Sequence, residues 1–302
     1  MRVLFLGTPE FAVPTLDALI RSSHTVVGVI TQPDRAVKRG KTEPCAVKKL
    51  ALASGLPVFQ PLKIRDDAQA LKGLGADIAV TAAYGQILTQ AVLDAFPLGV
   101  VNVHASLLPK YRGASPIQSA IAAGELETGV TIMRTELGLD CGDILAAEKT
   151  AIAADETAGE LTARLAEIGA RLLVKTLDNF KSVVPVKQDD AQATHCKTIK
   201  KHEEYLDFSA GAQAVVNRIR ALAPSPCAKA VICGETYKIG GATVCDGNGR
   251  VGEIVRCDKS LVIACGAGAV SVARIQAPSK RMLDISEFLR GKKFDVGVIC
   301  GE

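Results

Sequence analysis

The sequence contains no Trp, and only 4% of its 302 residues are aromatic. Proteins that recognise RNA by stacking bases on aromatic side chains depend on such residues, so the composition disfavours that mode of binding. The apolar runs all stay below the roughly 18 residues that a membrane span requires. The apolar run near the N-terminus, RVLFLG, is also too short for the core of a secretory signal peptide. We therefore expect a cytoplasmic protein without membrane association.

Metal-binding cysteine patterns are also lacking. The chain has nine cysteines, but they form no CxxC pair and no paired Cys/His spacing. Cys233, Cys245 and Cys265 stand in apolar runs, where a reduced cysteine is an ordinary small core residue. We expect these cysteines to be structural, and we expect no metal site.

The sequence has little overall excess of positive charge, since its formal net charge is only +4. The charge is unevenly distributed, however. Residues 34–49 carry six basic and two acidic side chains, an excess of four, whereas residues 50–180 carry ten basic and fifteen acidic ones. A basic loop on an acidic body suits a polyanionic substrate. An ordinary solvated connection can have the same composition, so composition alone leaves both interpretations open.

The first half alternates short apolar runs with segments of helical spacing. The runs at 2–7, 25–31, 77–83 and 99–104 are continuously apolar, which is typical of parallel strands covered on both faces. An amphipathic helix is predicted over 156–180. This alternation predicts a doubly wound, Rossmann-like α/β domain over residues 1–181, followed by a polar linker over 182–204.

The last part of the chain has a different pattern. After one helical segment at 209–222 come short runs rich in Val, Ile and Cys. Gly and Asn-Gly turn signals separate them at intervals of roughly 8–12 residues, which indicates an antiparallel all-β domain. We predict a small OB-like β-barrel over residues 205–302.

The segment VNVHASLLPKYRGASPIQ at 101–118 carries the strongest chemical signal. Asn102 and His104 lie on the same face at the end of a predicted strand, because side chains alternate along a strand. Open α/β sheets bind ligands beyond the carboxyl ends of their strands. There, a histidine can transfer protons and an asparagine can donate a hydrogen bond to an oxyanion.

A second segment, GVTIMRTELGLDCGDIL at 129–145, could bring a carboxylate to the same place. Its glycines would allow the chain to return Asp140 towards His104, where a carboxylate orients an imidazole and stabilises its protonated form. From spacing alone this inference is weak, because an aspartate this far from a histidine in the sequence is more often unrelated to it.

Together these two segments closely resemble the folate-dependent formyltransferase family. FLGTPEFAVPTLDAL, VVGVITQPDRAVKRGK and ETGVTIMRTELGLDCGD resemble, within that family, the group that acts on methionyl-tRNA. The resemblance covers nearly all of residues 1–180, and KTIKKHEEYLDFS and NRIRALAPSPCA extend it into the second domain. The segment PSPCAKAVI departs from the group, because it lacks the usual aromatic residues.

The resemblance implies the functional residues and the substrates. The catalytic set would be Asn102, His104 and Asp140. The folate-binding residues would be Tyr84, Gly85, Gln86, Ile87, Leu88, Ser106, Leu107, Leu108 and Pro109. The tRNA-binding residues would be Arg35, Lys38, Arg39, Lys41, Lys197, Lys200 and Lys201. The co-substrate would be 10-formyltetrahydrofolate and the acceptor methionyl initiator tRNA, bound by a monomeric enzyme that needs no metal.

Three alternatives stay open. Formyl transfer to a small amine would not require the second domain or the basic loop. A nucleotide-dependent oxidoreductase would be expected to have a G-x-G-x-x-G motif after the first strand, and FLGTPEF lacks it. A non-catalytic RNA-binding protein would not need Asn102, His104 and Asp140 together.

Overall fold

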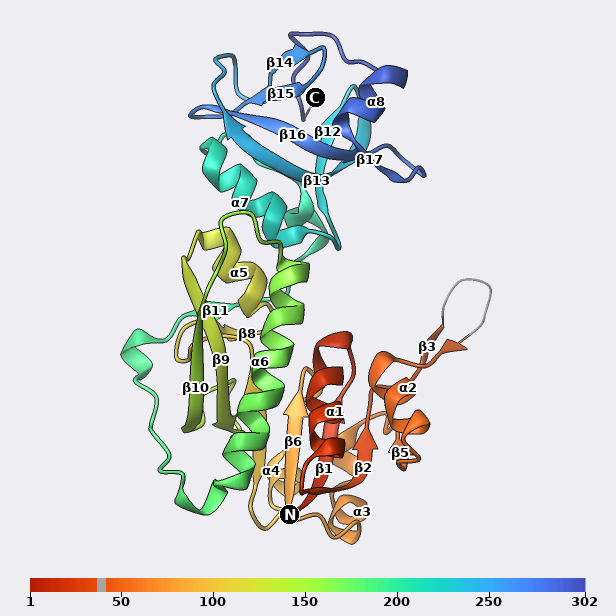
Figure 1. Cartoon of the computed structure of the whole chain (residues 1–302), viewed down its shortest axis with the longest axis vertical. Helices are drawn as coiled ribbons and strands as arrows, with labels where there is room; N and C mark the ends of the chain where they lie inside the picture. The colour runs from red at the N-terminus through yellow and green to blue at the C-terminus, as the bar shows by residue number, and fades with distance from the viewer. Residues whose placement is uncertain (37–41, 302) are drawn as a thin grey trace. The chain divides into compact units, whose positions relative to one another are not determined.

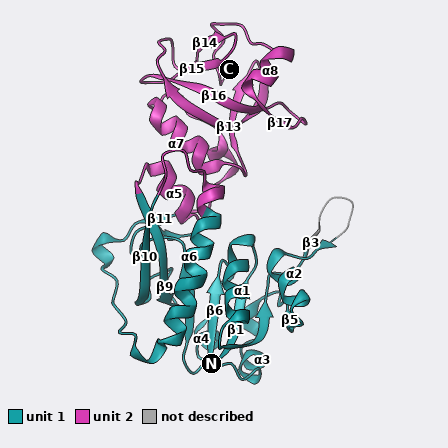
Figure 2. Ribbon diagram, in the orientation of Figure 1, with its two compact units in different colours: residues 1–113, 127–151, 162–196 teal, residues 114–126, 152–161, 197–302 magenta. Residues whose placement is uncertain are grey.

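The computed structural model describes residues 1–36 and 42–301 (Figure 1). The chain divides into two compact units that alternate along the sequence (Figure 2). Unit 1 comprises residues 1–113, 127–151 and 162–196, and unit 2 comprises residues 114–126, 152–161 and 197–302. The division into consecutive domains with a linker at 182–204 stays a prediction.

Unit 1 is built around a seven-stranded mixed sheet with the strand order β10-β9-β7-β6-β1-β2-β5. The five strands from β7 to β5 are parallel, whereas β9 pairs antiparallel with β7 and with β10. The strands are β1 (Arg2–Gly7), β2 (Thr25–Ile30), β5 (Val58–Phe59), β6 (Ile78–Ala82), β7 (Val100–His104), β9 (Glu127–Arg134) and β10 (Ile144–Ala151). The continuously apolar runs of the first half thus form buried parallel strands, which confirms the predicted Rossmann-like α/β fold.

The other elements of unit 1 surround this sheet (Figure 1). The helices are α1 (Val13–Arg21), α2 (Ala46–Ala53), α3 (Ala68–Gly73), α4 (Gln90–Leu93) and most of α6 (Ala158–Asp178), with 3-10 turns η1 (Glu10–Ala12), η3 (Ile64–Asp66), η4 (Phe180–Ser182) and η5 (Asp190–Gln192). Two short strand pairs complete the unit, β3 (Arg35–Ala36) with β4 (Thr42–Glu43), and β8 (Arg112–Gly113) with β11 (His195–Cys196). Along α6, Leu165 and Leu173 are fully buried, as the helical spacing predicts.

Unit 2 contains a curled antiparallel sheet that is consistent with a small barrel-like domain. Its strands are β12 (Ala228–Ile232), β13 (Glu235–Cys245), β14 (Ile254–Cys257), β15 (Leu261–Ala264), β16 (Ala269–Gln276) and β17 (Met282–Asp284). Its helices are α5 (Pro116–Ala123), α7 (Ala212–Leu222) and α8 (Ile285–Gly291), with the 3-10 turn η6 (Lys201–Glu204). Three of its aromatic side chains pack in the core, where Tyr237 meets Phe288 and Phe294 edge-on at centroid distances of 6.1 and 5.3 Å.

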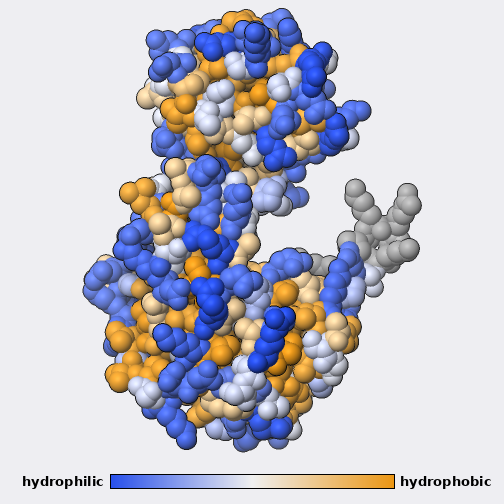
Figure 3. Space-filling view, in the orientation of Figure 1, coloured by the Kyte–Doolittle hydropathy of each residue, from blue (hydrophilic) through white to orange (hydrophobic). Residues whose placement is uncertain are grey.

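Within the described part of the chain, no helix is long and apolar enough to cross a membrane. On the face shown in Figure 3, hydrophobic side chains are interspersed with hydrophilic ones. Individual apolar side chains are nevertheless strongly exposed in unit 1, among them Leu62, Ile87 and Leu137.

The packing of α6 against the sheet depends on one glycine. A Cβ atom on Gly169 would lie 2.7 Å from Cγ1 of Val103 in β7 and 3.3 Å from Cγ1 of Val130 in β9. Valine is branched at Cβ and cannot easily turn away. Gly169 therefore allows the helix to approach the strand that carries Asn102 and His104.

We predict that Gly169→Ala destabilises the protein even though alanine favours helices by about 1 kcal/mol over glycine. Overpacking of a core contact costs about 1–3 kcal/mol, and for a domain of this size each kcal/mol lowers the melting temperature by roughly 2–4 °C. Thermal unfolding measures the effect. Gly73→Ala in α3 is the matched control, because no atom lies within 4 Å of its added Cβ. An unchanged or higher melting temperature for Gly169→Ala would contradict this packing argument.

Candidate active site

Asn102 and His104 lie where two adjacent parallel strands end. Thr81 in β6 pairs with Asn102 in β7, and His104 is the last residue of β7, opposite Thr131 of β9. The His104 side chain is buried, with 6% of its surface exposed. Because the strands are parallel, their carboxyl ends form one edge of the sheet, where open α/β folds bind ligands.

The hydrogen bonds of His104 determine which of its ring nitrogens is free. Nε2 lies 3.0 Å from the backbone carbonyl oxygen of Tyr111, which can only accept a hydrogen bond. Nε2 therefore carries a proton. In the neutral ring the lone pair is then on Nδ1, so Nδ1 is the atom that can take up a second proton.

Asp140 lies on the Nδ1 side of the ring. Its Oδ2 atom is 3.7 Å from Nδ1 of His104 and accepts a hydrogen bond of 2.8 Å from the backbone N–H of Gly113. The carboxylate therefore faces the nitrogen that holds the lone pair of the neutral ring. The structure thus brings together all three residues of the predicted catalytic set.

The amide of Asn102 is oriented by a neighbouring hydroxyl group. Oγ1 of Thr81 lies 2.9 Å from Oδ1 of Asn102 and donates to it. With Oδ1 engaged in this way, the NH2 group of Asn102 is directed to other acceptors. Sequence reasoning missed Thr81, because a threonine inside an apolar strand carries no signal until the pairing of β6 with β7 is known.

Asp140 reaches the site because the connection between β9 and β10, residues 135–143, folds back to the end of β7. Asp140 has a φ of +48°, in the left-handed region that residues other than glycine rarely adopt. Two buried polar residues, Arg112 and Gln188, take part in the hydrogen bonds around Asp140. Neither was predicted, and Gln188 lies in the segment predicted to be a linker.

The predicted folate residues Tyr84 to Leu88 directly follow β6. The Tyr84 side chain is buried, which raises the pKa of its phenol to about 12. Oε1 of Gln86 accepts a hydrogen bond of 2.8 Å from the backbone N–H of Ile64, which holds the segment in place. Ile87 is 85% exposed and Gly85 has a φ of +85°. This segment therefore presents backbone groups and one large apolar side chain.

The other predicted folate residues, Ser106 to Pro109, follow β7. The Ser106 hydroxyl is buried and donates to the carbonyl oxygen of Lys110 at 2.7 Å. Thr131 of β9 donates to the carbonyl oxygen of Ser106 and accepts from the N–H of Leu108. These bonds fix the turn beside His104. Both predicted folate segments thus begin at the same edge of the sheet.

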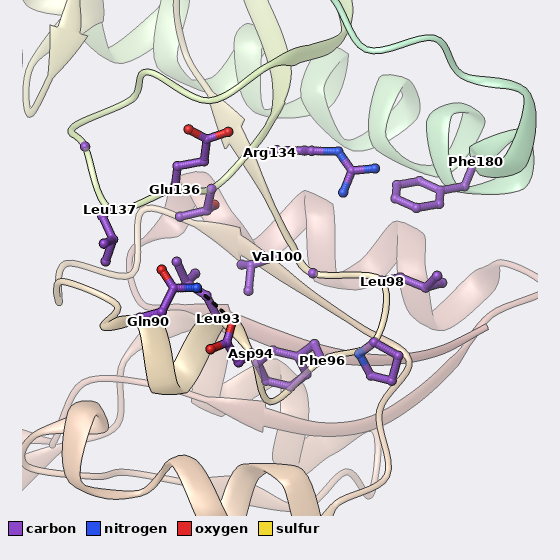
Figure 4. A pocket seen from close by; sticks show the side chains of 14 residues that line it. Gln90, Leu93, Asp94, Phe96, Leu98, Val100, Arg134, Glu136, Leu137 and Phe180 are labelled. Carbon is purple, nitrogen blue, oxygen red and sulfur yellow. Dashed lines mark hydrogen bonds between the residues drawn. The ribbon is translucent and has the colours of Figure 1, made fainter.

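A pocket of about 820 Å³ lies between α4 and the connection that carries Asp140 (Figure 4). In Figure 4 the Arg134 side chain points towards Phe180, and its guanidinium lies 5.6 Å from the centre of that ring. The lining also includes Gln90, Leu93, Glu136 and Leu137. None of the predicted folate residues lines this pocket.

The predicted tRNA residues are only partly described. Lys38, Arg39 and Lys41 lie outside the described residues, and Arg35 is placed by its backbone in β3 of unit 1. Just before Arg35, Asp34 accepts hydrogen bonds from Lys48 at 2.5 Å and Gln60 at 2.9 Å, and the Lys48 ammonium holds the pKa of that carboxyl below its usual value. Lys197, Lys200 and Lys201 are exposed in unit 2.

Groups of three or more His, Cys, Asp or Glu side chains suitable for a metal ion are not found among residues 1–36 and 42–301. A buried histidine and an oriented amide at the end of one strand, with a carboxylate 3.7 Å from the histidine ring, can supply side-chain donors to an oxyanion that forms during transfer of an acyl group. The mixed sheet and this site therefore define a group-transfer enzyme.

Comparison with known sequences gives the family. A sequence model described as "Formyl transferase" matches residues 1–177, and a second one, described as "Formyl transferase, C-terminal domain", matches residues 198–293. The chain belongs to the formyl transferase family. A methionyl-tRNA formyltransferase of Pseudomonas putida is 46% identical over 310 residues, which cover the whole of both chains.

Solved structures share the fold at lower sequence identity. HypX from Aquifex aeolicus, in complex with tetrahydrofolic acid, is 18% identical with a TM-score of 0.67, over 98% of this chain and 50% of that one. An N-formyltransferase from Helicobacter canadensis, in complex with folinic acid and dTDP-3-aminofucose, is 19% identical with a TM-score of 0.68, over 89% of this chain and 98% of that one.

We predict that Thr81→Val lowers the rate constant of formyl transfer about tenfold, which corresponds to about 1.4 kcal/mol. Valine has the shape of threonine but cannot donate to Oδ1 of Asn102, so the amide loses its fixed orientation. Steady-state kinetics measure the effect. Thr81→Ser retains the hydroxyl and should keep most of the activity. Equal rates for the serine and valine variants would show that the hydroxyl does not orient Asn102.

Proposed function

We propose that this chain transfers the formyl group of 10-formyltetrahydrofolate to the α-amino group of methionyl initiator tRNA, for translation initiation. The observation that carries the proposal is the buried His104 at the end of β7, two residues after Asn102 and with the Asp140 carboxylate 3.7 Å from its Nδ1 atom. The acceptor is inferred from the Pseudomonas putida methionyl-tRNA formyltransferase, which this chain matches at 46% identity from end to end.

The reaction can be followed through the atoms of the site. The neutral amine attacks the formyl carbon on N10 of the folate, a C–N bond forms, and the carbonyl oxygen becomes an oxyanion. The NH2 group of Asn102 and the proton on Nδ1 of His104 are the donors that stabilise it, and the Asp140 carboxylate keeps that proton on Nδ1. When the bond from carbon to N10 breaks, the proton lost by the amine passes to N10, through His104 or a water held by Asp140.

The exposed apolar side chains support a folate site beside His104. Ile87 follows β6, and Leu137 and Leu139 precede Asp140, each with more than 60% of its surface exposed. Exposed large apolar side chains are typical of surfaces that bind a partly apolar ligand, and a pterin is such a ligand. HypX and the Helicobacter canadensis enzyme share the fold and were solved with folates. We therefore retain Tyr84 to Leu88 and Ser106 to Pro109 as the proposed folate-binding segments.

The tRNA acceptor is favoured over a small amine by sequence identity. The Pseudomonas putida methionyl-tRNA formyltransferase is 46% identical to this chain from end to end, whereas the Helicobacter canadensis enzyme, solved with an amino-sugar nucleotide, is 19% identical. We propose that the loop at 34–43 and the lysines 197, 200 and 201 contact tRNA phosphates. We also propose a monomer that acts in the cytoplasm, where aminoacylated tRNA is available.

The proposal predicts a clear order of acceptors. With 10-formyltetrahydrofolate as donor, the purified protein should formylate methionyl initiator tRNA much faster than methionyl elongator tRNA, free methionine or an amino-sugar nucleotide. His104→Ala and Asp140→Asn should lower turnover by about 10²–10³ or more, since each removes stabilisation of the oxyanion. Binding of methionyl-tRNA should persist in both variants.

Asp17→Asn is the matched control, because Asp17 forms only a surface ion pair with Arg21 on α1. It should have wild-type turnover. Near-normal turnover of His104→Ala would contradict the catalytic assignment, whereas preferred formylation of the amino sugar would contradict the acceptor.

Affinity for tRNA should fall as salt concentration rises, because phosphate contacts release counterions. Replacing Lys197, Lys200 and Lys201 together with Gln should weaken binding and reduce the slope of log affinity against log salt by about 2. Filter binding at several salt concentrations measures both quantities. Replacing the exposed Lys63, Lys72 and Lys149 with Gln removes the same charge elsewhere and should leave the slope nearly unchanged. Equal slopes for the two triple variants would contradict the predicted contacts.

A further inference from the structure

Gln188 lies outside the predicted catalytic set but holds the backbone around Asp140. It is 5% exposed and stands between η4 and η5, in the segment that the sequence predicts to be a linker. Its Nε2 atom donates to the carbonyl oxygens of Asp140 at 2.9 Å and of Gly142 at 2.7 Å. Both hydrogens of the amide group are thus used on the connection that carries Asp140.

The other end of the Gln188 amide is fixed by Arg112. Nε and an Nη of Arg112 lie 3.0 and 2.8 Å from Oε1 of Gln188, and the same Nη lies 2.8 Å from a carboxylate oxygen of Asp190. A guanidinium only donates, so the atom that faces it must be the oxygen of the amide. The orientation of Gln188 follows from this, and all four hydrogen-bonding positions of its side chain are filled.

The same pair holds Asp140 from two sides. Gln188 binds the carbonyl oxygen of Asp140, while Gly113, next to Arg112 in β8, donates its N–H to the carboxylate. Asp140 needs such support because its φ of +48° is unfavourable for a residue with a side chain. Only glycine fits at position 113, since a Cβ there would lie 2.1 Å from the carbonyl oxygen of Cys196.

We propose that Gln188 and Arg112 are positioning residues for formyl transfer, acting through the backbone that presents the Asp140 carboxylate to Nδ1 of His104. This inference rests on the proposed function, because it assumes that Asp140 acts in the reaction. Neither residue is taken to touch the substrates. Both act through hydrogen bonds that keep the Asp140 carboxylate at a fixed distance from the His104 imidazole.

The role depends on the amide and not only on filling a buried position. A carboxylate in place of the Gln188 amide would still accept from Arg112 and would gain an ion pair with it. It would have no hydrogen to donate, and its second oxygen would repel the carbonyl oxygens of Asp140 and Gly142. Gln188→Glu therefore keeps the hydrogen bonds from Arg112 but removes those to the carbonyl oxygens of Asp140 and Gly142.

The experiment compares Gln188→Glu with wild type in formylation of methionyl initiator tRNA. We expect kcat to fall about 10–100-fold, as is typical when a reacting group is displaced by about 1 Å. KM for either substrate should change little, because the interaction lost is one made in the transition state. The amide proton of Gly113 should exchange faster with solvent in the variant, since its acceptor is no longer held.

Gln69→Glu is the matched control, because it makes the same change in an exposed side chain on α3. It should have wild-type kcat and wild-type exchange at Gly113. If Gln188→Glu is too unstable to assay, Gln188→Met tests the same loss of donors at similar length, with the same expected fall in kcat.

The outcomes distinguish this inference from the proposed function. If wild type does not formylate methionyl-tRNA, the proposed function is wrong. If wild type is active and Asp140→Asn is fully active, the catalytic role of Asp140 is wrong, and the positioning role falls with it. If both of those tests succeed and a folded Gln188→Glu or Gln188→Met retains wild-type kcat, only the positioning role is wrong. A raised KM at unchanged kcat would also overturn it, since that pattern belongs to a substrate contact.

Discussion

The site depends on bringing a carboxylate from a connection to a histidine on a strand. Asn102 and His104 are placed by the sheet itself, because β7 is paired on both sides, with β6 and β9. Asp140 is not held by strand pairing, because it lies in the connection between β9 and β10. Its 3.7 Å separation from Nδ1 of His104 is maintained by side-chain and backbone hydrogen bonds that converge on one strained residue. Every proposed catalytic step depends on this distance.

The proton arrangement of the site follows from its acceptors. A backbone carbonyl of Tyr111 fixes the proton on Nε2 of His104, which leaves Nδ1 to face the carboxylate. The hydroxyl of Thr81 fixes the oxygen of Asn102, which leaves the NH2 group available as a donor. Two neutral groups thus orient the two side chains that would bind the oxyanion. Such preorganisation makes donors effective, because they need not reorganise during the reaction.

The small number of aromatic residues bears on how the second unit could bind RNA. Tyr237, Phe288 and Phe294 pack against one another in the core of unit 2. They are therefore occupied in stabilising the curled sheet. Phe208 is buried as well, whereas Tyr205 is 44% exposed. A contact with tRNA by this unit would then rest mainly on phosphate-binding lysines and on shape, with Tyr205 as the aromatic ring open to stacking.

The sequence by itself determined the fold class and the first two members of the site. Continuous apolar runs predict buried parallel strands, and the alternation of side chains places Asn102 and His104 on one face. The family resemblance supplied Asp140, because spacing alone favoured an aspartate unrelated to His104.

Only the tertiary structure decided what holds the site together. Thr81 is 21 residues from Asn102, Gln188 is 48 residues from Asp140, and Arg112 is 76 residues from Gln188. Each is significant only through a partner that folding brings close. Gln188 lies in a polar segment without periodicity, so it was predicted as part of a linker. Hydrophobic periodicity reports which face of an element is buried, but it contains no information about which polar groups meet across elements. That pairing is decided by strand register and by the path of the connections, and here it decides where the Asp140 carboxylate lies.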